Sequence, residues 1–407
     1  LKSNDESESS IINEFSELFG PPPIDENGVG GSRLTPFDVE LTEGARITPL
    51  RARRSTPEIR AEIHKQMNER VMKGWQRQMD AEYYGEYASP LVAAWQNGKY
   101  RICGDYRQIN ERTKSCPWPT KNGEEVTARL AGSVYFTKLD LLKGYLQMKL
   151  TDRASKILAV ATPDGIFEPT TLPFGPKNGP AVFQHRISTE VLRELDGNGV
   201  ESFIDDLVVH SKTFDEHINL LRQVFERLRQ FELRLNPGKC SFCASSVEFL
   251  GQEVDGNGVR HTEQRKEALN NIKVPKDKAQ LRCFLGIAGY FRNHIQDFAR
   301  VAKPLTSLTQ KSVPFKLKWG SEQQEAFEQL KKLIVAAPMC YFIDYNKEIR
   351  VRTDASTIGL GAVLFQVVDG EERPIQFVSK AFNDTETKWS TIEQECFAVV
   401  HALCKWE

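Results

Sequence analysis

Apolar residues recur at every third or fourth position in three stretches of the chain, a spacing that places them on one face of a helix. The stretches predict helices from about 56 to 79, from about 180 to 195 and from about 214 to 228. The first begins at Ser55 and Glu58, whose three-residue spacing is typical of a capping box. The second ends at a run of turn-forming residues, Asp196-Gly197-Asn198-Gly199.

Short apolar runs bounded by turn residues predict strands between these helices. A hairpin is expected from about 90 to 103, with Asn97-Gly98 as its turn, and a further strand from 134 to 140. Two short strands, 202–204 and 207–209, flank Asp205-Asp206. The chain turns helical after about residue 275, and a strand at 348–354 opens what looks like a separate α/β unit. Strands interleaved with amphipathic helices predict an α+β fold.

The composition narrows the class of protein. A length of 407 residues allows about two or three domains. The chain has 54 Lys plus Arg against 55 Asp plus Glu, a net charge of -1. This balance excludes a polybasic coat or an acidic disordered tail as the whole protein, but a basic cleft for nucleic acid remains compatible with it.

The eight cysteines are too sparse for a disulfide scaffold and indicate reduced thiols in an intracellular setting. Cys240 and Cys243 have the spacing of a zinc knuckle, but no second Cys/His pair follows, so two partly buried thiols are expected. No apolar run approaches the roughly 18 residues of a membrane span, and no signal peptide or anchor is expected.

Residues 1–35 mix Ser, Asp, Glu, Pro and Gly and predict a flexible leader with one short helix near 15–18. Because the chain begins with Leu1, it reads as an excised or processed piece. The predicted helix that follows and its surroundings are basic, which fits either a solvated helix face or a contact with nucleic acid. The basic residues are Arg46, Arg51, Arg53, Arg54, Arg60, Lys65, Arg70 and Lys73.

The strongest chemical signal is the pair Asp205-Asp206 between two apolar strands. Adjacent carboxylates in apolar surroundings repel each other unless a cation neutralises them, although a hairpin turn that faces water is the simpler reading. Asp140 also ends an apolar strand. Three carboxylates from neighbouring strand ends fit two Mg²⁺ ions about 4 Å apart, the arrangement that serves phosphoryl transfer.

Five motifs in order resemble the reverse transcriptases of gypsy-type long-terminal-repeat retrotransposons, over a region that runs from about residue 36 to the end of the chain. They are Leu139 to Gln147, Leu172 to Gln184, Phe203 to Asp206, Leu235 to Cys240 and Phe249 to Gly251. Residues 284–292 and 302–305 are similar to the family's connection. The resemblance implies a right-hand polymerase of fingers, palm and thumb, joined to a ribonuclease H-like α/β domain.

The resemblance implies roles for individual residues. Asp140, Asp205 and Asp206 would bind the two Mg²⁺ ions, or Mn²⁺ in their place. Lys239 would protonate the leaving pyrophosphate, or else it is an ordinary surface lysine. Four residues are implied to bind substrate: Arg101 the triphosphate, Phe174 the nascent base pair, and Tyr145 and Gln184. Tyr145 would be a steric gate against the ribose 2′-hydroxyl, or else it is an ordinary core tyrosine. Phe249, Leu250 and Gly251 would form the primer grip.

Two positions depart from the family pattern. Where relatives usually carry two or three lysines before an Asp-Gly turn, this chain has Ala94-Trp95-Gln96-Asn97-Gly98, so the triphosphate loses an expected cation. Lys99 is the first candidate to replace it. Pro176 stands where leucine is usual.

The last segment resembles the start of a ribonuclease H domain. Asp354 lies on its first strand, and Glu395 opens an apolar helix, with Glu393 as the competing choice for the second catalytic acid. Because further carboxylates are needed, we expect an incomplete domain without hybrid-dependent RNA cleavage. Leu360, Val363, Leu364, Phe397 and Val400 are expected to be poorly buried.

The predicted organisation is a leader at 1–35, fingers and palm at 36–253, thumb and connection at 254–340 and an incomplete ribonuclease H-like domain at 341–407. The implied function is an RNA-directed DNA polymerase that uses deoxynucleoside triphosphates and an RNA or DNA template-primer. Its expected setting is the cytoplasm or a virus-like particle, with a Pol protease and integrase as neighbours. The alternative is a non-catalytic remnant of a mobile element that acts at most as a nucleic-acid-binding fold.

Overall fold

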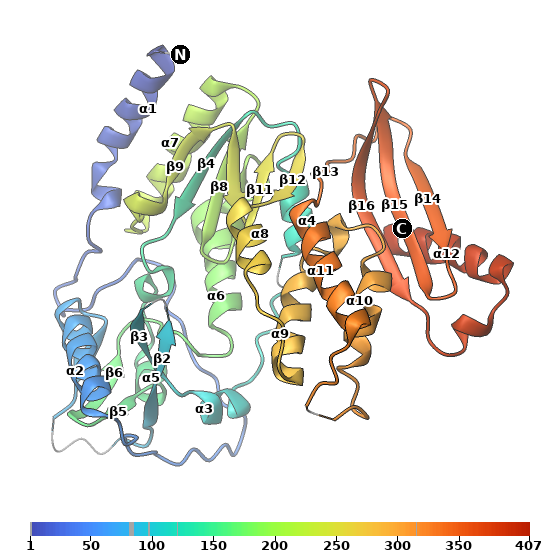
Figure 1. The fold of residues 1–407 in the computed structure, drawn as a ribbon. Helices are drawn as coiled ribbons and strands as arrows, with labels where there is room; N and C mark the ends of the chain where they lie inside the picture. The colour runs from blue at the N-terminus through green and yellow to red at the C-terminus, as the bar shows by residue number, and fades with distance from the viewer. Residues whose placement is uncertain (1, 81–84, 97, 120, 315) are drawn as a thin grey trace. The chain divides into compact units, whose positions relative to one another are not determined.

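The computed structural model describes the chain except for residues 1, 81–84, 97, 120 and 315. It divides into two compact units, residues 1–250 and 251–407, which are considered separately (Figure 1). The division lies close to the boundary expected between residues 253 and 254.

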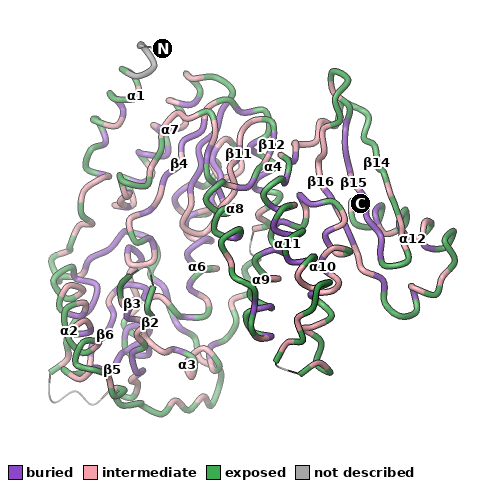
Figure 2. The backbone as a smooth tube through the Cα atoms, in the orientation of Figure 1, coloured by how far each residue is buried: buried purple, intermediate pink, exposed green. Residues whose placement is uncertain are grey.

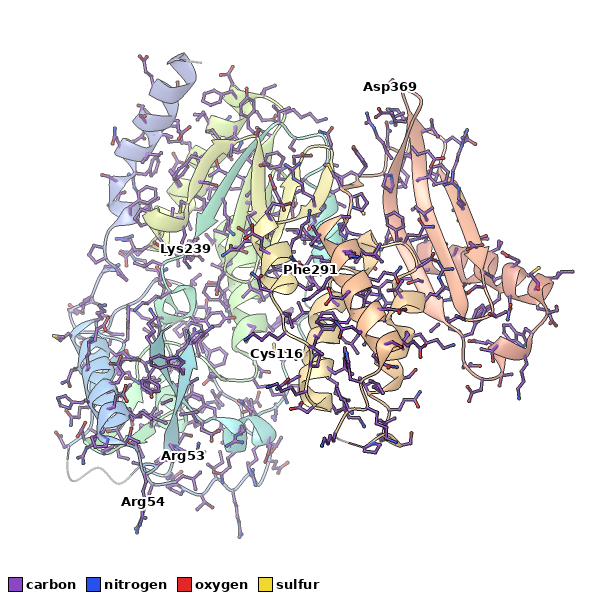
Figure 3. The ribbon with its side chains drawn as sticks, in the orientation of Figure 1. Arg53, Arg54, Cys116, Lys239, Phe291 and Asp369 are labelled. Carbon is purple, nitrogen blue, oxygen red and sulfur yellow. The ribbon has the colours of Figure 1, made fainter. Side chains whose placement is uncertain are left out.

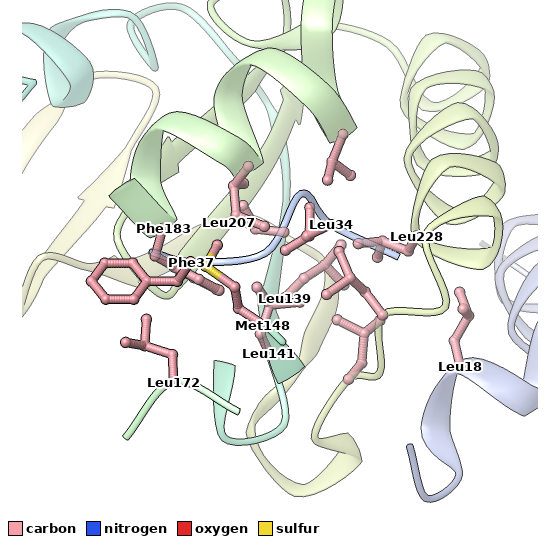
Figure 4. Packing of buried hydrophobic residues seen from close by; sticks show 14 of the residues in the cluster. Leu18, Leu34, Phe37, Leu139, Leu141, Met148, Leu172, Phe183, Leu207 and Leu228 are labelled. Carbon is pink, nitrogen blue, oxygen red and sulfur yellow. The ribbon is translucent and has the colours of Figure 1, made fainter. Parts of the chain in front are cut away.

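A four-stranded sheet in the first unit has the order β7-β8-β4-β9. Its strands are β4 (Tyr135–Asp140), β7 (Val200–Phe203), β8 (Asp206–Ser211) and β9 (Ser241–Ala244). Strand β8 has the apolar centre Leu207-Val208-Val209 and is buried after Asp206, and α7 (Phe214–Gln230) packs against it (Figure 2). Buried residues from these elements form the core beneath the end of the sheet, among them Leu139, Phe183 and Leu207 (Figure 4).

A five-stranded sheet of the same unit has the order β1-β6-β5-β2-β3. Its strands are β1 (Gln76–Gln78), β2 (Ser89–Gln96), β3 (Lys99–Gly104), β5 (Val160–Thr162) and β6 (Gly165–Pro169). Strands β2 and β3 form the predicted hairpin, with Gln96 opposite Lys99. Of its predicted turn, Gly98 has the positive φ of 77° that glycine tolerates, whereas Asn97 lies outside the described residues.

The helix predicted over 56–79 is shorter in the structure. Helix α2 (Pro57–Met72) begins after Thr56, whose hydroxyl accepts a hydrogen bond from the Ile59 N–H, so Thr56 and not Ser55 is the cap. The helix ends before Gly74, whose φ of 65° is left-handed, and the chain then pairs as β1 with β6. The predicted limit at residue 79 is therefore wrong, because strand pairing replaces the last helical turns.

The second and third predicted helices are present. Helix α6 (Gly179–Arg186) continues into a π-helical turn, Ile187–Leu192, and a 3-10 turn, Arg193–Leu195, while α7 matches the third prediction. The remaining helical elements of this unit are α3 (Arg107–Arg112), α4 (Gly123–Ala128), α5 (Asp152–Ile157) and the 3-10 turns Gly144–Gln147 and Pro237–Lys239. Strand β10 (Ser246–Phe249) lies beside β4.

The segment expected to be a flexible leader is folded against the first unit. Helix α1 (Lys2–Glu14) and the 3-10 turn Ser16–Phe19 pack on α7, as Figure 1 shows. Phe15 and Leu18 are fully buried, and Glu14 forms an ion pair with Arg222 of α7. The expectation of a loose leader is therefore wrong, because the apolar residues of this polar segment pack against α7.

The second unit opens with β11 (Gln252–Asp255), β12 (Gly258–His261) and β13 (Cys340–Tyr341), which pair in that order. A helical cluster with its own apolar core lies between them in sequence. It comprises α8 (Glu263–Asn270), α9 (Lys278–Gly289), the 3-10 turn Arg292–His294, α10 (Phe298–Ser307) and α11 (Ser321–Val335). The helical character predicted after residue 275 is confirmed.

The last part of this unit is a three-stranded sheet with one helix. Strands β14 (Arg350–Ala355), β15 (Gly359–Val368) and β16 (Glu371–Ala381) are antiparallel, and α12 (Thr391–Trp406) follows the 3-10 turn Glu386–Lys388. Leu360 and Leu364 are buried, whereas Val400 is 55% exposed. The expectation of poor burial is wrong for the two leucines, because α12 and α10 pack against this sheet. It is correct for Val400.

The structure bears on two further expectations, the absence of a membrane span and the state of two cysteines. In the described part of the chain, no helix is long and apolar enough to cross a membrane. Cys240 and Cys243 are free, partly buried thiols, as expected.

Candidate active site

Two neighbouring strands bring the predicted carboxylates to one end of the four-stranded sheet. Strands β4 and β8 pair antiparallel with Leu139 opposite Leu207 and Asp140 opposite Asp206. Both leucines are fully buried, so the register that covers the apolar core also sets the two aspartates side by side. Asp205 precedes Asp206 in the turn that joins β7 to β8. The convergence predicted from the sequence is therefore present in the backbone.

The turn that carries Asp205 has an unusual backbone. Ile204 has a φ of 55°, a conformation that β-branched residues rarely adopt. The amide oxygen of Gln184 accepts a hydrogen bond from the Ile204 N–H, and its amide nitrogen donates to the Ser202 hydroxyl at 3.0 Å. Gln184 is buried, so it positions the turn from below rather than reaching outward to a substrate.

Asp205 is the most electrostatically perturbed of the three carboxylates. Its Oδ1 is buried without a hydrogen-bond partner in the described structure, and a Cβ on Gly144 would lie 2.9 Å from it. Burial, followed by the negative charges of Asp206 and Asp140, raises the pKa of Asp205 to about 6. A nearby cation would stabilise the charged carboxylate and so lower this pKa.

Two lysines lie against the other carboxylates. The Lys239 Nζ is 3.3 Å from Asp140 Oδ2, and the Lys138 Nζ is 3.3 Å from Asp206 Oδ1 (Lys239 is labelled in Figure 3). With the side chains in these positions, no group of three or more His, Cys, Asp or Glu residues within the described ranges is arranged to hold a metal ion. Lys138 was missed from the sequence, although its position two residues before Asp140 places it on the same face of β4.

A cluster of aromatic rings with one arginine lies beside Asp205. Tyr145 is half-buried, with its ring centre 5.3 Å from that of Phe174 and 5.1 Å from that of Phe183. The guanidinium of Arg101 lies 4.6 Å from the centre of the Phe174 ring. Burial, and then the charge of Asp205, raise the pKa of Tyr145 to about 12, so its hydroxyl stays neutral. The structure thus brings together Tyr145, Phe174 and Arg101, three of the residues that the resemblance implies bind substrate.

Comparison with known proteins identifies both parts of the chain. Residues 93–254 match the family described as reverse transcriptase (RNA-dependent DNA polymerase), and residues 319–407 match the RNase H-like domain found in reverse transcriptase. The chain carries a reverse transcriptase domain followed by a ribonuclease H-like domain. The family recognised from the five motifs is therefore confirmed.

Similar proteins are retrotransposon polyproteins. The Pol polyprotein from transposon 297 of Drosophila melanogaster is 34% identical over 84% of this chain, and that from transposon opus of the same organism is 32% identical over 97%. The transposon Tf2-3 polyprotein of Schizosaccharomyces pombe is 30% identical over 91%. The chain spans only 32%, 40% and 27% of these relatives.

Solved structures of similar fold are foamy viral protease-reverse transcriptases. One, in complex with RNA/DNA hybrid, matches with a TM-score of 0.84 at 22% identity, over 100% of this chain and 53% of that one. Another, in complex with double-stranded DNA, has a TM-score of 0.86 at 22% identity and covers 69% of that chain. These likenesses confirm the predicted α+β polymerase fold.

The predicted primer grip of this reverse transcriptase domain divides into two kinds of residue. Phe249 is fully buried, so its side chain anchors the segment and cannot contact a primer directly. Leu250 has a φ of 51°. Its side chain lies against Gly123, where an added Cβ would be 2.9 Å from the Leu250 Cδ1. Gly251 also has a positive φ, of 73°.

In the ribonuclease H-like domain, the geometry separates the two competing glutamates. Glu393 closes the capping box of α12 with Ser390, and this hydrogen bonding lowers its pKa. Glu395 instead accepts a hydrogen bond from the Ala355 N–H, next to Asp354 on β14. Glu395 is therefore the better partner for Asp354.

Proposed function

We propose that this chain is the catalytic part of an RNA-directed DNA polymerase that adds deoxynucleotides to a primer 3′ end on an RNA or DNA template. The observation that carries this proposal is the direct pairing of Asp140 with Asp206, with Asp205 in the adjoining turn. The similar foamy viral structures are complexes with RNA/DNA hybrid and with double-stranded DNA, which supports the same substrates here.

Divalent cations suit the carboxylate cluster. Asp205 has an unpartnered buried oxygen, and burial, followed by the two like charges beside it, raises the pKa of its carboxyl. We infer that Asp140, Asp205 and Asp206 hold two Mg²⁺ ions, or Mn²⁺, once Lys138 and Lys239 move off their carboxylates. When bound, such ions supply charge neutralisation at the triphosphate and activation of the attacking hydroxyl.

The other residues bind and orient the substrate. We infer that the exposed guanidinium of Arg101 binds phosphate and that the Tyr145 and Phe174 rings shape the space for sugar and base. We infer that Lys239, which is exposed on its 3-10 turn, gives a proton to the leaving pyrophosphate once it has left Asp140. The protease and integrase of a Pol polyprotein are the proposed neighbours of this chain.

Extension of an oligo(dT) primer on poly(rA) with Mg²⁺ and dTTP tests the proposal. Extension by the purified protein supports a polymerase. Binding of the template-primer without any extension, with either Mg²⁺ or Mn²⁺, would instead identify the alternative, a non-catalytic nucleic-acid-binding remnant.

Tyr145 is expected to select the sugar. Replacing Tyr145 by Ala removes the ring that packs between Phe174 and Phe183, and the space gained admits a 2′-hydroxyl. We expect the ratio of kcat/KM for UTP over dTTP to rise by about tenfold or more, equivalent to about 1.4 kcal/mol. Tyr145→Phe keeps the ring and is the matched control, with an expected wild-type ratio. An unchanged ratio in active Tyr145→Ala would return Tyr145 to the role of a core residue.

Arg101 is expected to bind the triphosphate through its planar guanidinium. Arg101→Lys keeps the charge but loses both the two-pronged contact and the stacking on Phe174, so the KM for dTTP should rise by about tenfold. Arg222→Lys, on the surface of α7, is the control and should extend normally. Wild-type kinetics in Arg101→Lys would show that other cations hold the phosphates.

A further inference from the structure

Two lysines from separate segments lie over one buried tryptophan. Lys73 follows α2 directly, and Lys143 lies between β4 and the 3-10 turn that carries Tyr145. Their ammonium nitrogens are 5.2 Å and 4.7 Å from the centre of the Trp75 ring. Trp75 is 5% exposed, whereas both lysines are exposed. The ring therefore holds two positive charges together at the surface.

More cations surround this pair. The C-terminal part of α2 lies against β3, where Arg70 donates a hydrogen bond to the Ile102 carbonyl at 2.7 Å (Figure 1). Lys99 and Arg101, two residues apart on β3, share one face of that strand. We refer to Lys73, Lys143, Arg70, Lys99 and Arg101 as the cation cluster.

The cation cluster carries more positive charge than its acidic neighbours balance. Burial, followed by the charge of Lys73, lowers the pKa of Lys143, and Arg70 and Lys99 add to the effect while Glu69 opposes it. Glu69 pairs with Lys73, whereas among the described residues Lys99, Arg101 and Lys143 form no salt bridge. Like charges gathered without matching acids are unfavourable unless an anion joins them.

The cation cluster borders the proposed nucleotide site. Lys143 is followed by Gly144 and Tyr145. Gly144 lies against the Asp205 carboxylate, and the Tyr145 ring packs on Phe174, which also contacts the Arg101 guanidinium. The tip of the β2–β3 hairpin offers no lysine at Ala94, Trp95 or Gln96. Lys143 also has a left-handed φ of 51°, a strained conformation of the kind that accumulates at functional sites.

We propose that Lys73 and Lys143 bind the triphosphate of the incoming deoxynucleotide, and so replace the cations that the hairpin lacks. This inference rests on the proposed function and deepens it. Lysine suits the role because its ammonium acts as a compact point charge for phosphate. Contact with the phosphates of a nucleic-acid backbone is the rival use of the same charges, and Tyr145 and Arg101 beside them favour the nucleotide.

The test uses Lys73→Gln, Lys143→Gln and the double variant, with Lys212→Gln as control, an exposed lysine in the loop before α7. We expect the KM for dTTP to rise about fivefold in each single variant and about 25-fold or more in the double variant. The kcat and the Kd for poly(rA)/oligo(dT) should stay within about twofold of wild type. A wild-type KM in the double variant overturns the inference, as does a weakened Kd for template-primer at unchanged KM.

Equilibrium binding separates this inference from the proposed function. Binding of labelled dTTP and of inorganic tripolyphosphate is measured with Ca²⁺ and template-primer, where no turnover is needed. Loss of both ligands in the double variant supports the inference even if the wild type fails to extend, in which case only the polymerase proposal fails. Equal binding by wild type and double variant overturns the inference. Thermal unfolding should show little net change in stability, because relief of the repulsion offsets the loss of the Lys73–Glu69 pair and of the two contacts with Trp75.

Discussion

Asp205→Asn is expected to abolish primer extension while leaving the fold intact. The carboxylate lies in the turn beside the paired Asp140 and Asp206, and loss of one charge from such a cluster should lower kcat on the order of 10³-fold. The measurement is single-nucleotide extension on poly(rA)/oligo(dT) at saturating dTTP. Asp369→Asn removes a charge from an exposed turn of the second unit and is the matched control, with wild-type extension expected.

The same substitution should not cost stability. Because the pKa of Asp205 in the folded protein is raised to about 6, from an ordinary value of 3.8, the folded state binds more protons than the unfolded state between these pH values. The free energy of unfolding contributed by Asp205 therefore falls as pH rises from about 4 to about 6, and the penalty is complete at pH 7. Without divalent cations, Asp205→Asn should be as stable as wild type at pH 4 and about 1 kcal/mol more stable at pH 7. Chemical denaturation at both pH values measures this difference, and a variant less stable at pH 7 contradicts it.

Gln184→Leu is expected to lower extension by about 100-fold, although Gln184 does not face the substrate. The Gln184 side chain accepts from the Ile204 N–H and donates to the Ser202 hydroxyl. Leucine leaves the Ile204 N–H without this partner, whereas the Ser202 hydroxyl keeps its hydrogen bond to Asp196. Loss of this anchor should release the left-handed Ile204 and misplace the carboxylates that follow it. Because a buried polar group is left unpaired, stability should also fall, by about 1 to 3 kcal/mol.

A second substitution distinguishes positioning from simple destabilisation. Ile204→Gly removes the strain at a φ of 55°, so in the Gln184→Leu background it should recover part of the stability but not the extension rate. Gln223→Leu on the exposed face of α7 is the control and should change neither quantity. Full recovery of extension with recovered stability would show that Gln184 acts through folding alone.

The sequence by itself was sufficient to predict the carboxylate cluster and the class of chemistry that it suits. Asp140 and the Asp205-Asp206 pair each interrupt or end an apolar run, and buried strands at those positions can only present their acids at strand ends. The α+β fold also followed from local patterns, because helical and strand periodicities differ and do not depend on distant residues. The ordered motifs identified the family, since each is a short segment whose residues act together.

Only the tertiary structure decided which residues support those carboxylates and what the remaining charges do. Gln184 fits a substrate-binding motif, but burial under the β7–β8 turn makes it an anchor, and Phe249 is likewise a core residue. Lys73 and Lys143 belong to unrelated segments and meet only because both pack on Trp75. The buried Phe15 shows the same limit, because its segment is polar by composition and folds only where α7 offers an apolar face. Such contacts join residues far apart in sequence, and no local pattern records which surface a segment will cover.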